Sequence, residues 1–405
     1  MEPKASTVIL WTRLWWKGFE DRVMRTEDLG LKLGTRKETI VKTHLLSNRS
    51  GLIVWVLLLL AAPAMMGQDA KSLTILRWAL GAPQIDPLLA QTSVAKEMGY
   101  FAEGGIDVEV TPLGGGGRSV PLVASGRSEI GYIGAETLIL NASRGRDPGI
   151  ILIFNQNRDP MFLWVVNPDS SIKNIQDVKG ETIGTLSLAA AGTSYAKGVL
   201  MSLGIDPEND VEFVAVGTGP SSTALLQRGQ IAVLVQSDTI LAAMEQVGAE
   251  YRYLPETEYA ESYFQGGLFV RRDYLKTNRT EVCAFVRGIA KGVEFTFENP
   301  EAAIRIHWKI YPESKPKGMS EAEALKFSLA VLRSRMYKWD PSDELVKKHG
   351  AYSHEEWMKI VELMGLGDQV TDQMVHSLYT NEVVDCANDF DLQEVREQAR
   401  NYRLK

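Results

Sequence analysis

A glycine-rich loop, LGGGGRS at positions 113–119, is the first segment whose residue types could do chemistry. Its four successive glycines leave backbone N–H groups unobstructed before an expected helix, and such groups can bind an anion. The loop lacks the Gly-Lys-Ser/Thr ending of a Walker loop and the glycine spacing of a dinucleotide fingerprint. Either it binds a ligand or it is an ordinary flexible turn, because glycine clusters mark turns in general.

A second loop, LSLAAAGTS at positions 186–194, combines small side chains with a possible helix start. We expect Thr193 or Ser194 to cap the helix that follows. The small residues before the cap leave room for a ligand at a helix N-terminus, where the helix dipole favours a negative group. For Thr193 alone, a purely structural helix cap is the simpler interpretation.

Patterns that would indicate an enzyme or a metalloprotein were sought in the sequence and not found. The histidines at 307, 349, 354 and 376 form no His-Glu-x-x-His motif, and there is no Cys-x-x-Cys pair and no Gly-x-Ser-x-Gly elbow. We therefore expect a protein that has no catalytic residues, binds no metal and uses no cofactor.

The N-terminal segment predicts the compartment. An unbroken apolar run, GLIVWVLLLLAA at 51–62, follows Lys42 and Arg49 and precedes the small-x-small sequence Ala62-Pro63-Ala64. This order is typical of a secretory signal peptide, and the run is shorter than the ~20 residues of a membrane-spanning helix. We expect residues 1–64 to be an extension and signal peptide, cleaved after Ala64, and a periplasmic protein. An uncleaved membrane anchor is the alternative.

The composition limits the partners. A chain of 405 residues, 45% hydrophobic and 23% charged, can form two ordinary domains. Its formal net charge is −7, and the basic N-terminal segment makes the remainder more acidic still. An acidic surface argues against nucleic acid as a partner. The two cysteines, Cys283 and Cys386, could form one disulfide in an oxidising compartment, but sequence alone does not decide whether they pair.

An internal repeat predicts the architecture. Residues 106–126, IDVEVTPLGGGGRSVPLVASG, align without a gap with residues 209–229, NDVEFVAVGTGPSSTALLQRG. The copies share Asp-Val-Glu and glycines at equivalent positions. Two unrelated βαβ units can resemble each other by chance, because short apolar runs recur. The shared residues nevertheless favour duplication, and each copy is expected to fold as strand, helix, strand, helix, strand.

These elements predict an α/β protein with two lobes. In the first copy we expect strands at Thr74–Leu80, Ile106–Leu113 and Ile130–Ile133, with helices at Pro87–Tyr100 and Ser119–Ser125; the second copy runs from Thr182 to about Leu234. From Glu281 the apolar spacing becomes helical, with a break at Asn299-Pro300 and further helices starting near Glu321, Ser342, Ser353 and Asp389. The chain is expected to cross between lobes near Phe162 and Gly266. The predicted parts are therefore residues 73–160 for lobe 1, 161–265 for lobe 2, and 266–405 for the rest of lobe 1 with the C-terminal helices.

Ligands of open parallel α/β sheets bind outside the carboxyl ends of the strands, so the loops there are the expected site. Applied to both copies, this rule selects six loops that would line one cleft if the lobes face each other. The predicted ligand-binding residues are Gln84, Gly115, Gly116, Arg118, Gly134, Glu136, Thr137, Ala190, Ala191, Gly192, Thr193, Gly217, Thr218, Gln236 and Asp238. Each charged residue among them, and Arg158 nearby, could equally be a surface residue. Trp78 and Trp164 are more typical of a core than of a cleft.

Six segments, taken in order, are typical of one known family. They are AKEMGYFAEGGIDVEV from Ala95, LVASGRSEIGYIG from Leu122, VKGETIGT from Val178, LLQRGQIAVLV from Leu225, ENPEAA from Glu298 and YTNEVV from Tyr379. Singly each is weak, whereas together and in this order they are specific. In these segments the chain resembles a family of periplasmic binding proteins that includes taurine, alkanesulfonate and nitrate receptors and thiamine-pyrimidine-precursor binding proteins.

The resemblance implies a type II periplasmic-binding fold that closes on a small ligand and delivers it to an ABC permease in the inner membrane. The implied ligand is a sulfonate, nitrate, an aromatic acid or a pyrimidine, and we expect a monomer. Some relatives are instead pyrimidine synthases with a CCCFC motif, which this sequence lacks. A synthase-like enzyme and a ligand-sensing domain are the alternatives.

Overall fold

The structure is a computed structural model that describes residues 72–82, 84–114, 116–339 and 347–404. The expected signal peptide, Gly115 and the helix expected near Ser342 lie outside these residues. Along the described part of the chain, no helix combines the length and the apolar character that crossing a membrane requires.

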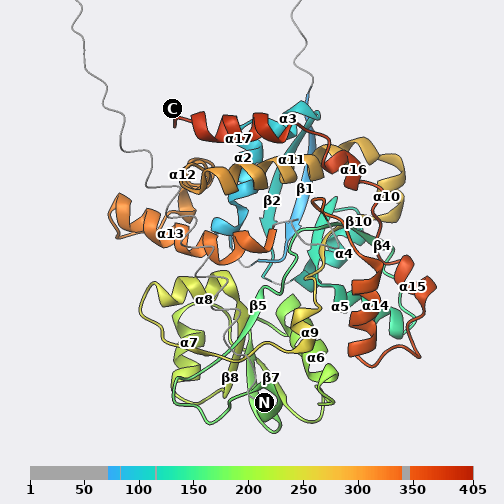
Figure 1. Cartoon of the computed structure of the whole chain (residues 1–405), viewed down its shortest axis with the longest axis vertical. Helices are drawn as coiled ribbons and strands as arrows, with labels where there is room; N and C mark the ends of the chain where they lie inside the picture. Colours follow the sequence, from blue (N-terminus) through green and yellow to red (C-terminus); the bar gives the residue numbers. More distant parts are fainter. Residues whose placement is uncertain (1–71, 83, 115, 340–346, 405) are drawn as a thin grey trace, which may run out of the picture. The chain divides into compact units, whose positions relative to one another are not determined.

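The first of two five-stranded sheets, sheet A, is built mainly from the first half of the described chain (Figure 1). Its order is β2-β1-β3-β10-β4, in which β1 pairs in parallel with β2 and β3, whereas β10 runs antiparallel to β3 and β4. Its strands are β1 (Thr74–Leu80), β2 (Ile106–Pro112), β3 (Ile130–Ile133), β4 (Ile150–Asn155) and β10 (Gly267–Arg271).

The second sheet, sheet B, has the same arrangement. Its order is β7-β6-β8-β5-β9, with β6 parallel to β7 and β8, and β5 antiparallel to β8 and β9. Its strands are β5 (Phe162–Val166), β6 (Thr182–Thr185), β7 (Glu212–Ala215), β8 (Val233–Ser237) and β9 (Arg252–Tyr253). The aligned copies of the sequence repeat therefore form corresponding strands of the two sheets: β2 corresponds to β7, and β3 corresponds to β8.

Each sheet contains one antiparallel strand, and in each case it is the first strand that the chain forms after crossing from the other sheet. The chain leaves sheet A after β4 and enters sheet B at β5, and it returns to sheet A at β10. The connecting segments, 156–161 and 254–266, hydrogen-bond to each other: the Gln265 N–H donates to the Asn157 carbonyl at 3.2 Å. The Gln265 side chain, fully buried, also accepts from the Met161 N–H at 3.1 Å. We call these two segments the crossing segments.

Helices connect the strands, as the repeat predicts. Those of the first copy are η2 (Pro87–Leu89), α2 (Ala90–Glu97), α3 (Tyr100–Glu103), η3 (Gly116–Arg118), α4 (Ser119–Ala124) and α5 (Ala135–Ser143). Those of the second are η4 (Ile175–Val178), α6 (Ala191–Ser202), α7 (Pro220–Gln227), α8 (Asp238–Glu245) and α9 (Glu258–Glu261). The single helix expected over 87–100 is divided, because Gly99 adopts a left-handed conformation with φ 77° and starts a new turn.

The C-terminal part is helical, and its boundaries follow local capping. Asn299 separates α11 from α12 and accepts a hydrogen bond from the Ala302 N–H, while Pro300 begins α12. Ser320 and Ser353 form capping boxes with Glu323 and Glu356. The last helix starts at Leu392 rather than at Asp389, because Asp391 is its cap. The elements are α10 (Arg272–Thr277), α11 (Arg279–Glu298), α12 (Pro300–Ile310), η5 (Pro312–Ser314), α13 (Glu321–Met336), η6 (Tyr337–Trp339), α14 (His354–Leu363), α15 (Asp372–His376), α16 (Val384–Ala387) and α17 (Leu392–Asn401).

Helix α11 is the central helix of the sheet A core. Phe285 stacks on Phe101 at 5.9 Å between ring centroids and meets Trp78 edge-on at 5.8 Å. Cys283 on α11 forms a disulfide with Cys386 on α16, which answers the question that the sequence left open. The α/β class that the sequence predicts is confirmed.

Close packing of α11 against α2 depends on a glycine. A Cβ atom at Gly292 would lie 2.1 Å from the Gln91 backbone carbonyl oxygen. We predict that Gly292→Ala destabilises the protein by about 1–3 kcal/mol, although alanine is the better helix former, because one helix must move away from the other. Urea unfolding measures the effect. Gly367→Ala is the matched control, since a Cβ there meets nothing within 4 Å, and equal effects of the two substitutions would contradict the account.

Candidate ligand-binding site

A small cavity lies where the ends of strands from both sheets meet. Its walls come from the ends of β1, β3 and β8, the segments after β4 and β6, and helices η2, α8, α13 and η6. The lining residues are Trp78, Leu80, Gly81, Ala82, Asp86, Leu88, Tyr132, Gln156, Asn157, Met161, Phe162, Leu186, Ala190, Ala191, Gln236, Ser237, Thr239, Ile240, Arg335 and Trp339. The cavity thus lies at the carboxyl ends of the parallel strands, where α/β sheets bind ligands.

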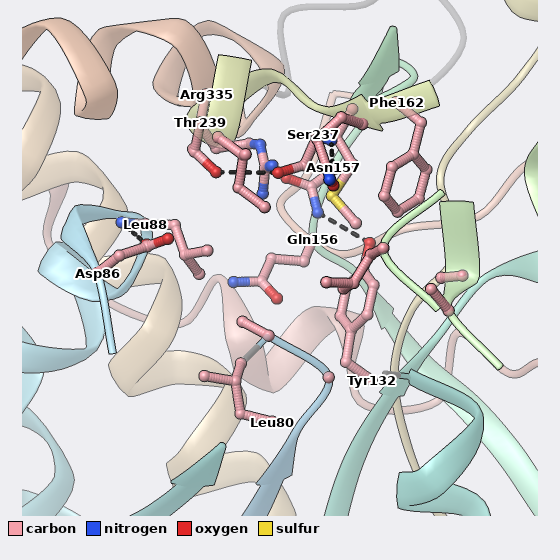
Figure 2. A pocket seen from close by; sticks show the side chains of 18 of the residues that line it. Leu80, Asp86, Leu88, Tyr132, Gln156, Asn157, Phe162, Ser237, Thr239 and Arg335 are labelled. Atoms are coloured by element: carbon pink, nitrogen blue, oxygen red, sulfur yellow. Dashed lines mark hydrogen bonds between the residues drawn. The ribbon is translucent and has the colours of Figure 1, made fainter. Parts of the chain in front are cut away.

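The walls are mostly apolar and aromatic. In the view of Figure 2, Asp86 and Leu88 lie on one side of the cavity and Tyr132 and Phe162 on the other, with Leu80 below. Aromatic faces of this kind suit a flat ligand, because they offer a large contact area with fixed geometry. The volume of about 90 Å³ leaves room for a compact molecule.

Two buried polar atoms of the lining have no hydrogen-bond partner among the described residues. One is the indole Nε1 of Trp78, a donor, and the other is the amide Oδ1 of Asn157, an acceptor. The Asn157 amide nitrogen donates to the Tyr132 hydroxyl at 3.0 Å, which fixes the side chain (Figure 2). Buried polar atoms are normally paired, so a bound molecule that reached this donor and this acceptor would supply the partners that the described residues do not.

Arg335 is buried at the cavity wall and already faces a carboxylate. Its Nε donates to both oxygens of Asp238 at 3.0 Å, and its Nη2 donates to Oδ1. The Nζ atom of Lys338 lies 2.8 Å from the other oxygen of Asp238. Burial opposes ionisation of Asp238, but the two cations hold its pKa below the ordinary value. The three side chains form a buried ion triad, which we call the Asp238 triad.

Asp86 is an acidic group of the cavity lining that changes protonation state close to neutral pH. Burial raises its pKa to about 6, although a hydrogen bond from the Leu88 N–H at 2.8 Å and the charge of Arg335 oppose the rise. Among the described residues, no cation donates a hydrogen bond to this carboxylate. Asp86 therefore supplies an acceptor near pH 7 and a donor once it is protonated.

Three of the predicted site residues line the cavity: Ala190, Ala191 and Gln236. Gln236 is also tied to the fold, because its amide donates to the Gly217 carbonyl at 3.0 Å. Gly192 lies beside the cavity, where a Cβ would meet the Phe162 ring at 2.9 Å. Asp238 does not line the cavity, but it holds Arg335 there.

The glycine-rich loop approaches the alanine loop of the second copy. The Gly117 N–H donates to the Ala189 carbonyl at 3.2 Å, and a Cβ at Gly117 would lie 2.9 Å from that oxygen. At Gly117 the glycine thus permits a close backbone contact between the two copies. Arg118, which follows, is exposed and donates to the Leu113 carbonyl at 3.2 Å. Gly116 starts η3, and Gln84 is exposed.

The cap expected for α6 is wrong. The helix starts at Ala191 with Ala190 as its extended N-cap residue, so Thr193 lies inside the first turn. The Thr193 hydroxyl donates to the Ser187 carbonyl at 2.8 Å and thereby closes the loop. Thr193 lines a second, more open cavity together with Thr137, while Gly217 and Thr218 belong to the loop after β7.

The cavity residues from the first crossing segment and from the C-terminal helices were not predicted from the sequence. Gln156, Asn157 and Met161 belong to a segment that was interpreted only as a connection. Arg335 lies in a helical region where the strand-end rule does not apply. Trp78 was interpreted as a core residue, and it is both 1% exposed and part of the cavity wall. Arg158 forms an ion pair with Glu356 at 3.1 Å and does not line the cavity.

Glu136 is fully buried at the start of α5, away from the cavity. Helix α6 approaches it at Gly198, where a Cβ would lie 3.4 Å from the Glu136 Cγ atom and 2.5 Å from the Tyr259 hydroxyl. Burial raises the pKa of Glu136 to about 8, although the hydroxyl groups of Tyr263 and Tyr259 lower it in part. Glu136 is therefore a neutral acid at pH 7 and supplies no charge there.

This burial predicts a pH dependence of stability. Between about pH 4.5 and pH 8 the unfolded chain ionises Glu136 while the native state retains the proton, so stability falls as pH rises through this window. We predict that Glu136→Gln leaves the melting temperature nearly unchanged at pH 5 and raises it at pH 8. Calorimetry at both values tests this. The exposed Glu250→Gln is the control, and a substitution at Glu136 that lowers stability equally at both pH values would refute the assignment.

Comparison with known proteins gives a consistent result. A family model described as "NMT1/THI5 like" matches residues 87–303. The formylaminopyrimidine-binding protein of Halalkalibacterium halodurans is 22% identical over 283 residues, which are 70% of this chain and 82% of that protein. Residues 87–303, which the family model matches, include both crossing segments and most of the residues that line the cavity.

Solved structures share the fold. The periplasmic nitrate-binding protein NrtA from Synechocystis PCC 6803 superposes with a TM-score of 0.55 at 12% identity, covering 82% of this chain and 99% of that one. The alkanesulfonate-binding protein SsuA from Xanthomonas axonopodis pv. citri gives a TM-score of 0.52 at 14% identity, covering 78% and 97%. At these identities the likeness concerns the fold alone, and the predicted periplasmic-binding fold is confirmed.

Proposed function

The chain belongs to the NMT1/THI5-like family, and from that premise we propose that it is the extracytoplasmic solute-binding component of an ABC importer. In this proposal the protein is secreted to the periplasm, works as a monomer, binds a small molecule and delivers it to a permease. It is a receptor and not an enzyme. The binding proteins to which the chain is similar, for nitrate, alkanesulfonate and formylaminopyrimidine, support this class of function.

The proposed mechanism is closure of two lobes. Lobe 1 comprises residues 73–160 with 266–405 and is centred on sheet A, and lobe 2 comprises residues 161–265 and is centred on sheet B. The crossing segments are the hinge, and the cavity between the strand ends is the binding site. A ligand that contacts both walls shifts the population towards the closed state by its better contacts there.

The proposed ligand is a small, flat, nitrogen-containing heterocycle of the pyrimidine class. The observation that carries this choice is the unpaired donor of Trp78 and the unpaired acceptor of Asn157, on two residues that line one mostly apolar cavity with several aromatic side chains. A heterocycle with adjacent ring acceptors and amino donors can satisfy both atoms at once. Asp86 offers a further acceptor for an N–H group.

A fully ionised ligand such as a sulfonate fits the same walls less well. Among the described lining residues Arg335 is the only cation, and its guanidinium already donates hydrogen bonds to Asp238. An anion would lie near the carboxylate of Asp86, and like charges that are close together repel. The charge of Asp86 therefore favours a neutral ligand or one with N–H donors.

A ligand screen tests the proposal. The purified protein is titrated by calorimetry with aminopyrimidines, alkanesulfonates, nitrate and aromatic carboxylates. We expect saturable one-to-one binding of an aminopyrimidine. The melting temperature should rise with ligand concentration, because a ligand that binds only the native state stabilises it. Selective binding of a sulfonate or nitrate would overturn the ligand class, and product formation from a bound pyrimidine would overturn the assignment as a receptor.

Asp86 predicts how this binding depends on pH. Since its pKa is about 6 in the free protein, protonation below pH 6 removes the acceptor that the ligand N–H requires. Affinity for the aminopyrimidine should therefore fall by up to about tenfold per pH unit below pH 6. Asp86→Asn should weaken binding at pH 7.5 and abolish this pH dependence, whereas Asp169→Asn, at an exposed position, should preserve it. A pH profile unchanged in Asp86→Asn would exclude the contact.

A further inference from the structure

Three metal-ligating side chains meet on the surface of the C-terminal helices, outside the lining of the cavity. His354 is the first residue of α14, and Asp372 and His376 are the two ends of α15. One ligand atom from each of the three residues lies within 4.8 Å of the others. The sequence analysis assigned no metal site, because the residues come from two helices and form no linear motif.

The geometry of this cluster is convergent. The Nε2 atom of His354 lies 2.8 Å from Asp372 Oδ1, and the Nε2 atom of His376 lies 3.5 Å from Asp372 Oδ2. Two ligand atoms on one tetrahedral zinc ion, each about 2.0–2.1 Å from the metal, are about 3.3 Å apart. The two observed distances lie on either side of that value. An imidazole binds a metal in the plane of its ring, so at least one of the two stacked rings must turn before both Nε2 atoms can reach one ion.

The His354 ring is already held in an orientation suited to a ligand. Its Nδ1 atom lies 3.2 Å from the Tyr379 hydroxyl, which can accept a hydrogen bond from Nδ1–H in the tautomer that leaves the Nε2 lone pair for a metal. Tyr379 stacks on the buried Trp357 ring at 5.3 Å between centroids. Its neighbours Leu378 and Thr380 hydrogen-bond to Leu152 at the edge of sheet A. The site therefore rests on rigid elements.

The other two histidines of the described residues, His307 and His349, form hydrogen bonds in the protein interior. His307 and His349 are buried, and they contact Ser93 and Glu294 respectively at 2.9 Å. By contrast, the His354 and His376 side chains are 30% and 57% exposed, so an ion in solution can reach them. Their rings are parallel, with centroids 4.0 Å apart, and both face the same carboxylate.

We propose that His354, Asp372 and His376 bind one divalent transition-metal ion of the zinc class. A set of two imidazoles and one carboxylate binds zinc and the neighbouring transition metals in preference to magnesium or calcium. Three protein ligands leave a fourth position for water or for a group from another molecule. The site is separate from the ligand cavity and does not depend on the proposed transport function.

The test is a zinc titration of the full protein, prepared without a polyhistidine tag and stripped with a chelator. We expect one Zn²⁺ per chain in competition with a chromophoric chelator. His376→Ala and Asp372→Asn should each weaken binding at least tenfold. Asp368→Asn, which removes an exposed carboxylate close by in the sequence, should leave the affinity unchanged.

A second readout separates coordination from general charge effects. Co²⁺ bound in place of zinc should give visible absorption bands typical of imidazole coordination, and these should disappear in His354→Ala and His376→Ala. Circular dichroism verifies that each variant is folded. Absence of stoichiometric Zn²⁺ binding, or binding of equal affinity in folded His376→Ala, Asp372→Asn and Asp368→Asn variants, would overturn the proposal.

Discussion

The carboxylate of Asp238 is buried between two cations, Arg335 and Lys338, and this pairing joins parts of the chain that are distant in sequence. Asp238 starts α8, which follows a strand of sheet B, whereas Arg335 and Lys338 lie 97 and 100 residues further on. Desolvation makes buried charges costly, so each depends on its partners. Removing Asp238 would leave two cations in the interior without a counter-charge. The triad is therefore a strong constraint on how α13 and η6 lie against α8.

This constraint also determines the chemistry of the cavity. Because Asp238 holds Arg335 in place, the guanidinium contributes a fixed wall, and Asp86 remains as the acidic group open to a ligand. Lys338 extends the triad to the first crossing segment, since it donates to the Pro160 carbonyl and its own carbonyl accepts from the Arg158 N–H at 2.7 Å. The same crossing segment supplies Gln156, Asn157 and Met161 to the cavity. Ligand contacts, the triad and the hinge proposed above therefore share one short stretch of chain.

The sequence predicted the parallel strands of the two copies well because the repeat showed the same pattern twice, whereas β4 and β9 lie outside the copies and were not predicted. The alternation of apolar runs with glycine turns gave β1 and β3 at their observed bounds, and the rule for strand ends led to Ala190, Ala191 and Gln236. Arg335 could not be found in this way, because a helix from the C-terminal part supplies it through tertiary packing. Tyr132 was hidden inside a predicted strand, where sequence does not tell which side chain faces a cavity. The cluster of His354, Asp372 and His376 likewise exists only once α14 and α15 are packed together.

The central claim is that the Asp238 triad couples α8 to α13, and a double-mutant cycle of unfolding free energies tests it most directly. Asp238→Asn leaves two buried cations without a counter-charge, so it should cost about 3–5 kcal/mol, whereas Arg335→Met leaves Asp238 paired with Lys338 and should cost less. The account predicts that the double variant is more stable than the sum of the two losses implies, with a coupling energy within the range of about 0.5–3 kcal/mol seen for residues in contact. Additive losses in urea unfolding, with no coupling beyond error, would contradict the account.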